Sequence, residues 1–149
     1  MRALIQRVKE CRVEVKGSMV GAIDKGLLIL LGVGEDDKEM DCEFLANKII
    51  HLRIFPDSAD LMNMSLVDIS GEAMVVSQFT LWGDCRKGRR PSFTRAAQPE
   101  RAKLLYELFI GKLRQKGIRV ATGVFQENMN VYLVNEGPVT LMLDSEKRF

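Results

Sequence analysis

The first part of the chain consists of short segments with the apolar and polar patterns of β-strands. Val13 and Val15 alternate with charged neighbours, which is typical of a strand with one buried face. A Gly-Ser pair at 17–18 indicates a tight turn, so the segment 19–23 is expected to return as the second strand of a hairpin. The apolar segment 27–33 lies between two glycines and predicts a buried strand.

Two longer segments carry apolar residues at helical spacing. In the first, Asp36 and Glu39 resemble a capping box that opens a helix, and the turn signal at 56–58 ends that element. The apolar stripe of this helix is Cys42, Leu45, Ile49 and Leu52. The second helix is expected to begin near Pro99, which suits a first turn, and to end near Gly117, which suits a C-terminal cap. Its expected buried face is Ala102, Leu105, Leu108, Phe109 and Leu113.

The remaining apolar segments predict further strands, at 73–81, 120–124, 130–135 and 139–143. The order of elements is therefore strands, helix, strand, helix, strands. This order predicts an α+β fold, in which two main helices pack on a mostly antiparallel or mixed β-sheet. The sequence shows no internal repeat and no linker, so residues 1–149 are expected to form a single domain.

Composition and charge exclude only a few classes of function. The formal net charge of +2 is too small to indicate a nucleic-acid-binding protein by itself. The cysteines, Cys11, Cys42 and Cys85, are odd in number and widely spaced, and there is one histidine, so neither a disulfide framework nor a metal or other cofactor is expected. This cysteine usage, without a signal-peptide stretch, favours the cytoplasm. The longest apolar run, 27–31, is far shorter than the roughly 20 residues that span a bilayer.

The segment 77–80 places polar side chains at the end of an apolar strand. Hydroxyl and amide groups in such a place cost free energy unless they are paired. If the strand continues, Ser77 and Phe79 share one face, and Gln78 and Thr80 share the other. Two interpretations stay open: a strand end whose hydroxyls bond neighbouring backbone, or part of a functional site. Thr80 is not expected to be an activated nucleophile, because no histidine lies near it in sequence.

The one histidine gives no support to a catalytic triad. His51 falls late in the first predicted helix, and we interpret it as a partly buried structural residue outside the site. A serine-histidine-acid triad is therefore disfavoured. The acidic pairs near the start of the same helix fit its N-terminal cap and solvent face better than a pair of catalytic carboxylates.

A cluster of cations lies between the two helices. It includes Arg86, Lys87, Arg89, Arg90 and Arg95. Gly88 and Pro91 within this cluster predict a loop, which is either simply solvated or binds a phosphate backbone. Trp82 and Phe93 nearby offer rings on which a nucleobase could stack, which favours nucleic acid as the partner.

The Gly137–Pro138 step also has two interpretations. It is either a hairpin turn between two strands, or a device that presents backbone carbonyls at a fixed angle. The sequence alone does not decide whether the Gly137–Pro138 peptide bond is cis or trans.

In order along the chain, these segments resemble the D-aminoacyl-tRNA deacylase family. The resemblance is most specific at 77–81, at Gly88 with 90–93, and at 135–140. It extends over nearly the whole chain through the segments 1–8, 26–33, 48–55 and 62–66. There are two departures: the segment 58–61 replaces a proline-aspartate-glycine-lysine type of loop, and Trp82 stands where relatives often have another aromatic or an aliphatic residue.

The resemblance implies a homodimer that hydrolyses the ester between a D-amino acid and the terminal adenosine of tRNA, and that also clears glycine mischarged onto tRNA. It implies that a cis step at Gly137 and Pro138 enters the partner subunit's site and selects the chirality of the substrate. The residues expected to line the pocket around the ester and the adenosine are Ser77, Gln78, Phe79 and Thr80.

The resemblance leaves the catalytic group open between the Thr80 hydroxyl and a ribose hydroxyl of the tRNA, and it favours the ribose. Arg7 is expected to brace the Gly-Pro loop. The cations Arg86, Lys87, Arg89 and Arg90 are expected to bind the acceptor end of tRNA.

Three other functions stay open at this stage. A module that binds single-stranded RNA ends would explain the basic loop, but not the Gly-Pro step. An unrelated esterase of small acyl substrates would not need the basic loop. A purely structural dimer subunit is the third alternative.

Overall fold

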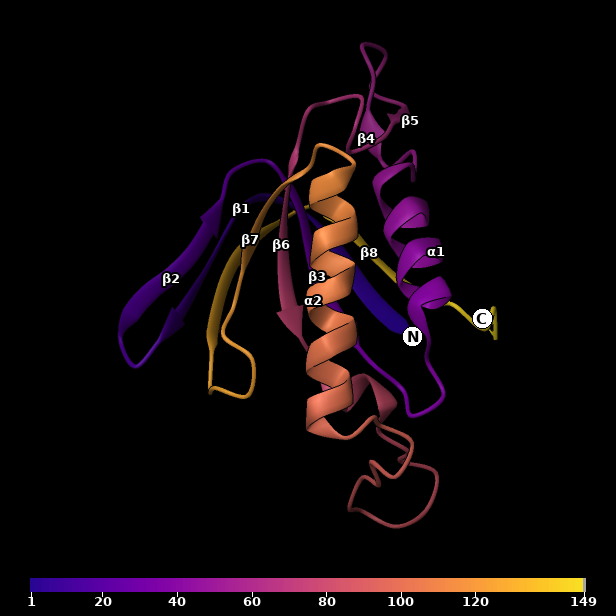
Figure 1. The fold of residues 1–149 in the computed structure, drawn as a ribbon. Helices are drawn as coiled ribbons and strands as arrows, with labels where there is room; N and C mark the ends of the chain where they lie inside the picture. Colours follow the sequence, from indigo (N-terminus) through magenta and orange to yellow (C-terminus); the bar gives the residue numbers. More distant parts are fainter. Residues whose placement is uncertain (149) are drawn as a thin grey trace.

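The computed structural model describes residues 1–148, which form an α+β fold with a mixed sheet and two main helices, as the sequence predicts (Figure 1). Its elements are β1 (Arg2–Val15), β2 (Ser18–Ile23), β3 (Gly26–Gly32), α1 (Glu39–Ile50), β4 (Phe55–Pro56), β5 (Met62–Met64), β6 (Glu72–Ser77), the 3-10 helix η1 (Phe79–Trp82), α2 (Pro99–Gln115), β7 (Arg119–Thr122) and β8 (Asn130–Asp144). Within the described residues, no helix has the length and apolar character needed to cross a membrane.

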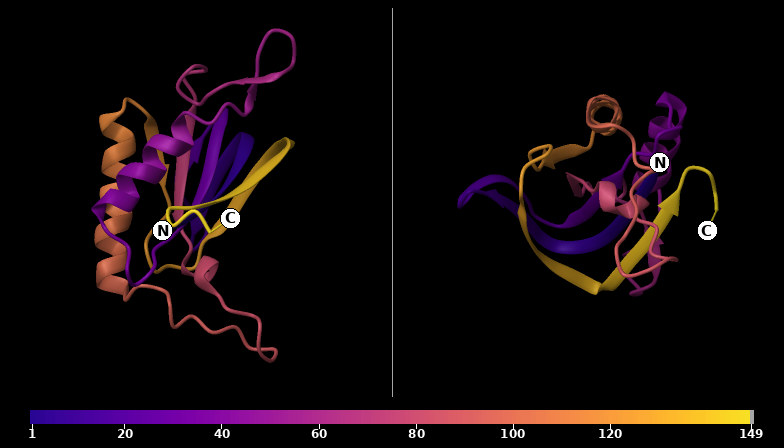
Figure 2. Two further views of the ribbon diagram at one scale, coloured as in Figure 1. Left: turned by 90° about the vertical axis from the view of Figure 1, so that its right-hand side faces the viewer. Right: turned by 90° about the horizontal axis from the view of Figure 1, so that it is seen from below.

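The long strand β1 organises the main sheet. The strand order is β2-β1-β3-β6-β7, and β8 also pairs with β1. Antiparallel pairing joins β1 to β2, β3 and β8, whereas β6 runs parallel to both β3 and β7. Because β1 changes its partner from β3 to β2 along its length, the sheet curves, and β8 lies on the side away from the helices (Figure 2).

Both helices cover one face of this sheet, and α1 and α2 lie side by side (Figures 1 and 2). Beneath them, alternate residues of β1, β3 and β6 pack against Leu45 and Phe109, which are fully buried. The opposite face of β3 and β6 is also covered, since Leu28, Met74 and Val76 belong to a second buried cluster. This burial on two faces explains the continuous apolar sequence of β3.

Several local predictions are confirmed. β1 and β2 form the expected hairpin, in which Lys16 and Gly17 have positive φ at the turn. α2 begins at Pro99 and is followed by Gly117, whose φ of +82° suits a C-terminal cap. Lys112 of α2 forms ion pairs with two glutamates of α1, which join the helices at their exposed edge.

The predicted start and end of the first helix are wrong. α1 begins at Glu39, and it is Asp41 whose carboxylate accepts the Lys38 N–H, at 2.8 Å. The residues before it form a turn, because the Asp37 carboxylate accepts the Gly34 N–H at 2.6 Å. The helix ends at Ile50, well before the predicted turn signal at 56–58.

The strand predicted over 73–81 is also wrong at its end. β6 stops at Ser77, and residues 79–82 form η1 instead. The reason is the loss of strand partners, since β7 pairs only as far as Val75 and β3 ends at Gly32. The proposed alternation of side chains between two faces of a strand at 77–80 therefore does not occur.

The prediction of separate strands at 130–135 and 139–143 is wrong as well. β8 is one strand that pairs with β1 on both sides of the Gly-Pro step. Asn135 lies opposite Val8 and Thr140 opposite Gln6, so residues 136–139 form a bulge opposite Arg7. The Gly-Pro step is thus not a hairpin turn. It projects from the side of a continuous strand.

Candidate active site

A cavity of about 630 Å³ opens where β6 ends and η1 begins. Ser77, Gln78 and Phe79 line it on one side. The other walls are formed by the residues before and within the first turns of α2, and by the connection between β7 and β8. The cavity therefore brings together segments that lie far apart in the sequence. It contains part of the motif that sequence reasoning singled out.

Thr80 lies on the exposed side of η1 and is not among the residues that line this cavity. Its hydroxyl oxygen accepts a hydrogen bond from the Gln78 side-chain amide. An amide donor does not remove a proton, so the Thr80 hydroxyl keeps its own proton and can donate it to a third group. The geometry suits a hydrogen-bond donor better than a nucleophile.

Aromatic rings form much of the cavity wall. Phe79 is 58% exposed and makes an edge contact with Phe93, with ring centroids 5.1 Å apart. Across the cavity, Tyr106 and Phe125 lie 5.7 Å apart between centroids. The Tyr106 hydroxyl donates to the main-chain carbonyl of Val75 at 2.8 Å, and burial raises the pKa of Tyr106 to about 12. Tyr106 is therefore a protonated donor across the working pH range.

The Gly-Pro bulge is held by Arg7. The Gly137–Pro138 peptide bond is cis, and Gly137 has a φ of +117°. Arg7 is buried, with 8% of the residue exposed. Its guanidinium donates to the main-chain carbonyls of Glu136 and Ile54. A Cβ on Gly137 would lie 2.6 Å from an Arg7 nitrogen. The contacts thus support the expected bracing of the bulge by Arg7.

Asn135 closes the base of the same bulge. Its side-chain amide donates to the main-chain carbonyls of Arg7, at 2.9 Å, and Val139, at 3.1 Å. Gly137 and Pro138 themselves remain exposed. The bulge is therefore a fixed protrusion rather than a loose loop.

The bulge and η1 lie apart in this chain. The Arg2 guanidinium donates to the carbonyl of Leu81 in η1, at 2.9 Å, whereas Arg7 contacts the bulge. Both arginines belong to β1, and five strand residues span about 17 Å. Neither Gly137 nor Pro138 lines the cavity. One chain by itself thus does not bring the two halves of the predicted site together.

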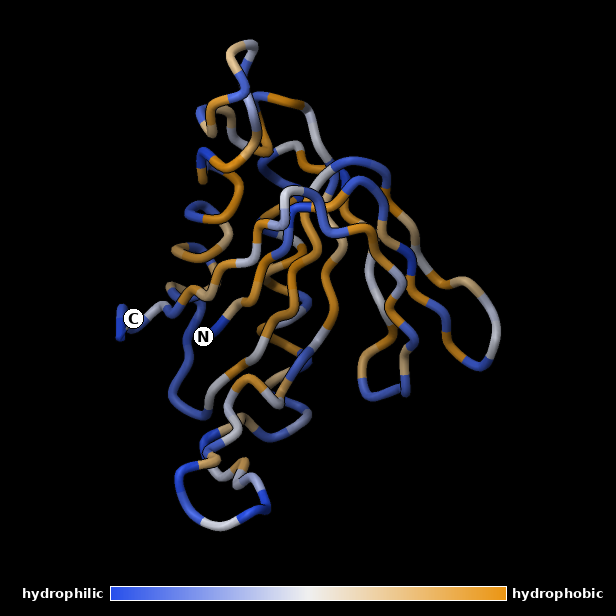
Figure 3. Tube along the Cα trace, turned by 180° about the vertical axis from the view of Figure 1, so that it is seen from behind, coloured by the Kyte–Doolittle hydropathy of each residue, from blue (hydrophilic) through white to orange (hydrophobic). Residues whose placement is uncertain are grey.

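The cationic segment forms an exposed loop beyond η1, with backbone hydrogen bonds in both directions between Asp84 and Ser92 (Figures 1 and 3). The Asp84 carboxylate accepts two hydrogen bonds from the Arg86 guanidinium, at 2.9 and 2.7 Å, and this contact lowers the pKa of Asp84. Lys87, Arg89 and Arg90 are exposed. The predicted loop is confirmed, and its role in binding stays a prediction.

Comparison with known proteins identifies the family. The family described as D-Tyr-tRNA(Tyr) deacylase matches residues 4–144. The chain belongs to this family. It is 58% identical to a D-aminoacyl-tRNA deacylase of Thermotoga petrophila and 56% identical to one of Clostridioides difficile, with both chains covered completely in each case.

Solved structures show the same fold. One named c-Myc DNA Unwinding Element Binding Protein has a TM-score of 0.91 and 36% identity, covering 97% of this chain and 98% of its own. A second, described as a probable eukaryotic D-amino acid tRNA deacylase, has a TM-score of 0.83 at 18% identity, covering 95% and 97%, and shows likeness of fold alone. The predicted resemblance to the deacylase family is thus confirmed.

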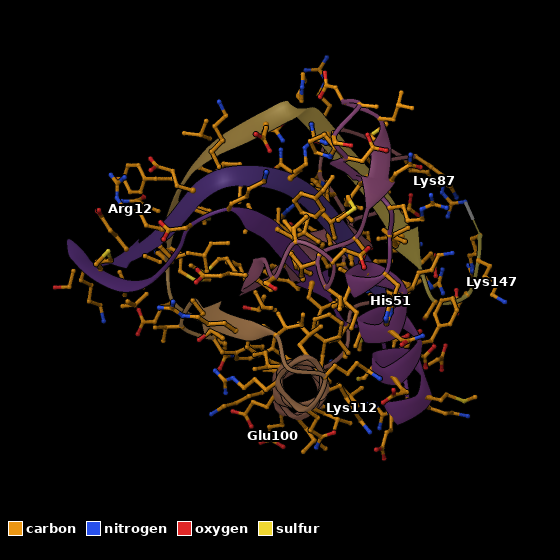
Figure 4. All side chains as sticks on the ribbon, turned by 90° about the horizontal axis from the view of Figure 1, so that it is seen from above. Arg12, His51, Lys87, Glu100, Lys112 and Lys147 are labelled. Atoms are coloured by element: carbon orange, nitrogen blue, oxygen red, sulfur yellow. The ribbon has the colours of Figure 1, made fainter. Side chains whose placement is uncertain are left out.

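Sequence reasoning missed several cavity residues of this deacylase-family chain. Tyr106 was not recognised, because its position in α2 looks like ordinary helix surface or core. Phe125 and Met129 lie in the connection between β7 and β8, where no motif marks them. The excluded histidine does lie outside the cavity, but His51 is exposed rather than partly buried, and its Nδ1 lies 2.9 Å from the Asn47 carbonyl (Figure 4).

Proposed function

We propose that the chain hydrolyses the ester bond of D-aminoacyl-tRNA and of mischarged glycyl-tRNA, and that it rejects L-aminoacyl-tRNA. Membership in the deacylase family makes it a hydrolase. The single observation that carries the finer proposal is the pairing of an aromatic cavity at η1 with a rigid, exposed Gly-Pro bulge elsewhere on the chain.

The chemistry needs little side-chain help. An aminoacyl ester is already activated, so its hydrolysis depends on positioning and on stabilising the oxyanion that develops. The first N–H groups of η1, at Phe79 and Thr80, have no acceptor within the helix and would donate to the ester carbonyl. The Thr80 hydroxyl would add a further donor, and Ser77 and Gln78 would line the approach to the cavity.

Water is the nucleophile in this mechanism. A hydroxyl of the terminal ribose orients the water molecule, which attacks the ester carbonyl carbon. The bond from that carbon to the ribose oxygen then breaks. The amino acid leaves as the free acid, and the ribose oxygen takes up the proton that the attacking water loses. This route needs no histidine and no deprotonated threonine.

Backbone atoms from a second copy of the chain would distinguish D-aminoacyl from L-aminoacyl substrates. The carbonyls of Gly137 and Pro138 hold the α-amino group of the substrate, so a D side chain points outward and an L side chain meets the backbone wall. Glycine has no side chain to clash and is accepted. The bulge is exposed and does not line the cavity of its own chain, which supports a homodimer in which each bulge serves the partner's cavity.

The basic loop would supply affinity for the acceptor end. Arg86, Lys87, Arg89 and Arg90 contact tRNA phosphates, so binding weakens as salt rises. We also place the protein in the cytoplasm, because charged tRNA is its substrate and its three cysteines are free thiols.

The direct test compares single-turnover deacylation of D-Tyr-tRNA, L-Tyr-tRNA and Gly-tRNA. We expect rapid release from the D and glycyl substrates and little release from the L substrate. L-Tyr-tRNA hydrolysed as fast as D-Tyr-tRNA would exclude the chiral mechanism.

Mixed dimers test the shared site. A subunit with Gln78→Ala loses its own cavity chemistry, and a subunit with Pro138→Ala loses the bulge that it lends. If the sites are shared, one of the two sites in the mixed dimer combines a normal cavity with a normal bulge. Mixing the two variant proteins should then restore up to half of the D-selective deacylation of the unmodified dimer per heterodimer. No recovery in a verified heterodimer would contradict sharing.

Binding of nucleic acid without catalysis is a second candidate, favoured by the exposed basic loop and by the name of the 36% identical structure, c-Myc DNA Unwinding Element Binding Protein. Protein that binds D-aminoacyl-tRNA without releasing the amino acid would support it. The esterase alternative predicts turnover of a free amino-acid ester that is comparable with that of charged tRNA and insensitive to salt.

A further inference from the structure

The position of η1 depends on one buried side chain. Phe79 and Thr80 are exposed, whereas Trp82 at the end of η1 is 4% exposed. A single 3-10 turn is a weak element. Its Gln78 carbonyl accepts from the Leu81 N–H at 3.3 Å, and its Thr80 carbonyl accepts from the Gly83 N–H at 2.9 Å. Trp82 therefore anchors a turn that would be poorly fixed by its own hydrogen bonds.

The Trp82 ring packs directly against the main chain of two glycines, Gly32 and Gly34, at the end of β3. A Cβ on Gly34 would lie 2.4 Å from a ring carbon of Trp82, and a Cβ on Gly32 would lie 3.2 Å from another. Main chain at the end of a buried strand moves little, so the backbone surface that contacts the Trp82 ring is rigid. The ring nitrogen of Trp82 is buried without a hydrogen-bond partner among the described residues, so no hydrogen bond from the ring fixes its position.

Two guanidinium groups lie against this ring. The Arg2 guanidinium carbon is 4.1 Å from the ring centroid, and that of Arg95 is 5.0 Å from it. Arg2 also donates to the Leu81 carbonyl at 2.9 Å, so it contacts both the ring and the backbone of η1. Cations over an indole ring are attracted by its quadrupole, and more strongly where water is excluded.

Arg95 links the ring to the basic loop. It follows the loop in sequence, and its carbonyl accepts the Glu35 N–H at 3.0 Å. Two residues later, the Ala97 N–H donates to the Val33 carbonyl at 3.0 Å, and both residues line the cavity. The chain that leaves the basic loop thus touches the Trp82 ring at Arg95, between Phe93 and Ala96, which both line the cavity.

We propose that Arg2, Trp82 and Arg95, the Trp82 cluster, are positioning residues that hold η1 for catalysis and couple it to tRNA bound at the basic loop. This inference rests on the proposed deacylase function. None of the three residues touches the ester. They act by fixing the backbone N–H groups of η1, and Arg95 transmits a shift of the loop to the ring.

Kinetics of Arg95→Lys give the first test. Lysine keeps the positive charge that tRNA meets but loses the planar group that stacks on the ring. Small displacements of reacting groups have large effects on rate, so we expect kcat for D-Tyr-tRNA to fall on the order of 10-fold, with KM changed less than about 3-fold. A residue that only binds phosphate would change KM instead.

Arg12→Lys is the matched control. The Arg12 guanidinium also stacks on an aromatic ring, that of Tyr132, at 4.1 Å. Figure 4 shows Arg12 at the edge of the molecule opposite Lys87 of the basic loop. Losing this stack should leave kcat unchanged, which separates the specific effect from the general cost of removing an arginine-aromatic contact.

Two variants of Trp82 give the second test. Trp82→Phe keeps an aromatic face over the same glycines, and should keep kcat within about 3-fold. Trp82→Leu keeps an apolar side chain without that face, and should lower kcat by at least 10-fold with a circular dichroism spectrum like that of the parent. Equal kcat values for the two folded variants would overturn the proposal.

Fluorescence tests the coupling directly, because Trp82 is the only tryptophan of the sequence. Uncharged tRNA carries no ester to hydrolyse, but it can still bind the basic loop. We expect it to change Trp82 emission in a saturable way, with a midpoint equal to the Kd from filter binding. The same titration of Arg95→Lys should give a much smaller change at full occupancy.

The outcomes separate this inference from the proposed function. Unmodified protein that does not hydrolyse D-Tyr-tRNA would refute the function. Active protein whose emission is unaffected by saturating tRNA, or whose Arg95→Lys form keeps the parent's kcat, would refute the Trp82 cluster alone.

Discussion

Replacing Gly137 by alanine tests the Gly-Pro bulge at its most constrained position. A φ of +117° is rarely adopted by residues with a side chain, and such backbone strain costs about 1–3 kcal/mol. The added Cβ would also lie 2.6 Å from an Arg7 nitrogen, whereas ordinary contacts begin near 3.4 Å. The guanidinium must therefore move by about 0.8 Å, and a buried, charged hydrogen bond of this kind contributes about 1.5–3 kcal/mol. We expect Gly137→Ala to lower the free energy of unfolding by about 3–5 kcal/mol.

The functional effect should be loss of selectivity. If the bulge is the wall that excludes L side chains, a displacement approaching 1 Å should lower the ratio of D-Tyr-tRNA to L-Tyr-tRNA deacylation by at least about 10-fold. Single-turnover rates on the two substrates give this ratio, and urea unfolding followed by circular dichroism gives the stability.

Gly117→Ala provides the control. Gly117 also has a positive φ, +82°, but a Cβ there meets nothing within 4 Å. This variant should show a backbone cost of about 1–2 kcal/mol with an unchanged D-to-L ratio. If Gly137→Ala is no less stable than Gly117→Ala, Arg7 does not hold the bulge rigidly. If its D-to-L ratio equals that of the parent, the bulge is not the chiral wall.

Three further predictions concern the basic loop, the cavity and the thiols. Asp84→Asn should release the Arg86 guanidinium for phosphate and steepen the salt dependence of tRNA binding by about 1 in slope, whereas Arg89→Ala should make it shallower by about 1, as filter binding over a range of salt would show. Tyr106→Phe removes one of two donors to the Val75 carbonyl, which still accepts the Gly123 N–H at 3.2 Å, so it should cost only about 0.5–1.5 kcal/mol in urea unfolding, with little loss of cavity shape. Cys85 should be the only thiol of the native protein to react quickly with an aromatic disulfide reagent at pH 8, because burial raises the pKa of the other two to about 11 and about 12.

Local patterns in the sequence were sufficient for elements that depend on near neighbours. The β1–β2 hairpin follows from a turn signal between alternating residues, and α2 follows from Pro99, Gly117 and one apolar stripe. Each of these signals acts within a few residues. The structure therefore agrees with the prediction there, including the C-terminal cap of α2.

Elements that depend on distant partners were predicted poorly. The sequence of 77–81 has strand character, but the chain turns into η1 because β3 and β7 offer no further pairing. In the same way, 130–144 reads as two strands around a turn, and only its register with β1 reveals a continuous strand with a bulge. Sequence periodicity carries no information on where a neighbouring strand stops.

The same distinction applies to the candidate site. Sequence reasoning found the polar motif and the Gly-Pro step because each is locally unusual. It missed Tyr106 and Phe125, because an aromatic residue on a helix or in a connection is ordinary until the fold places it beside a cavity. The resemblance to a known family supplied roles for the two motifs, but not the geometry that relates them.

That geometry changes how the two motifs are to be understood. A chiral filter and a hydrolytic pocket within one chain would be expected to share one cavity, yet η1 contacts Arg2 and the bulge contacts Arg7, two residues of β1 whose main-chain positions lie about 17 Å apart. Each half is nevertheless held in place by its own contacts, since Arg7 and Asn135 fix the bulge and Trp82 fixes η1. Two rigid halves, both exposed and both separately braced, are what a site completed by a second copy requires, because neither half can adjust to the other after the subunits meet. If the proposed homodimer forms, selectivity should depend on how the two subunits pack, so variants that loosen the bulge should lose discrimination, whereas variants that loosen η1 should lose the rate of ester cleavage.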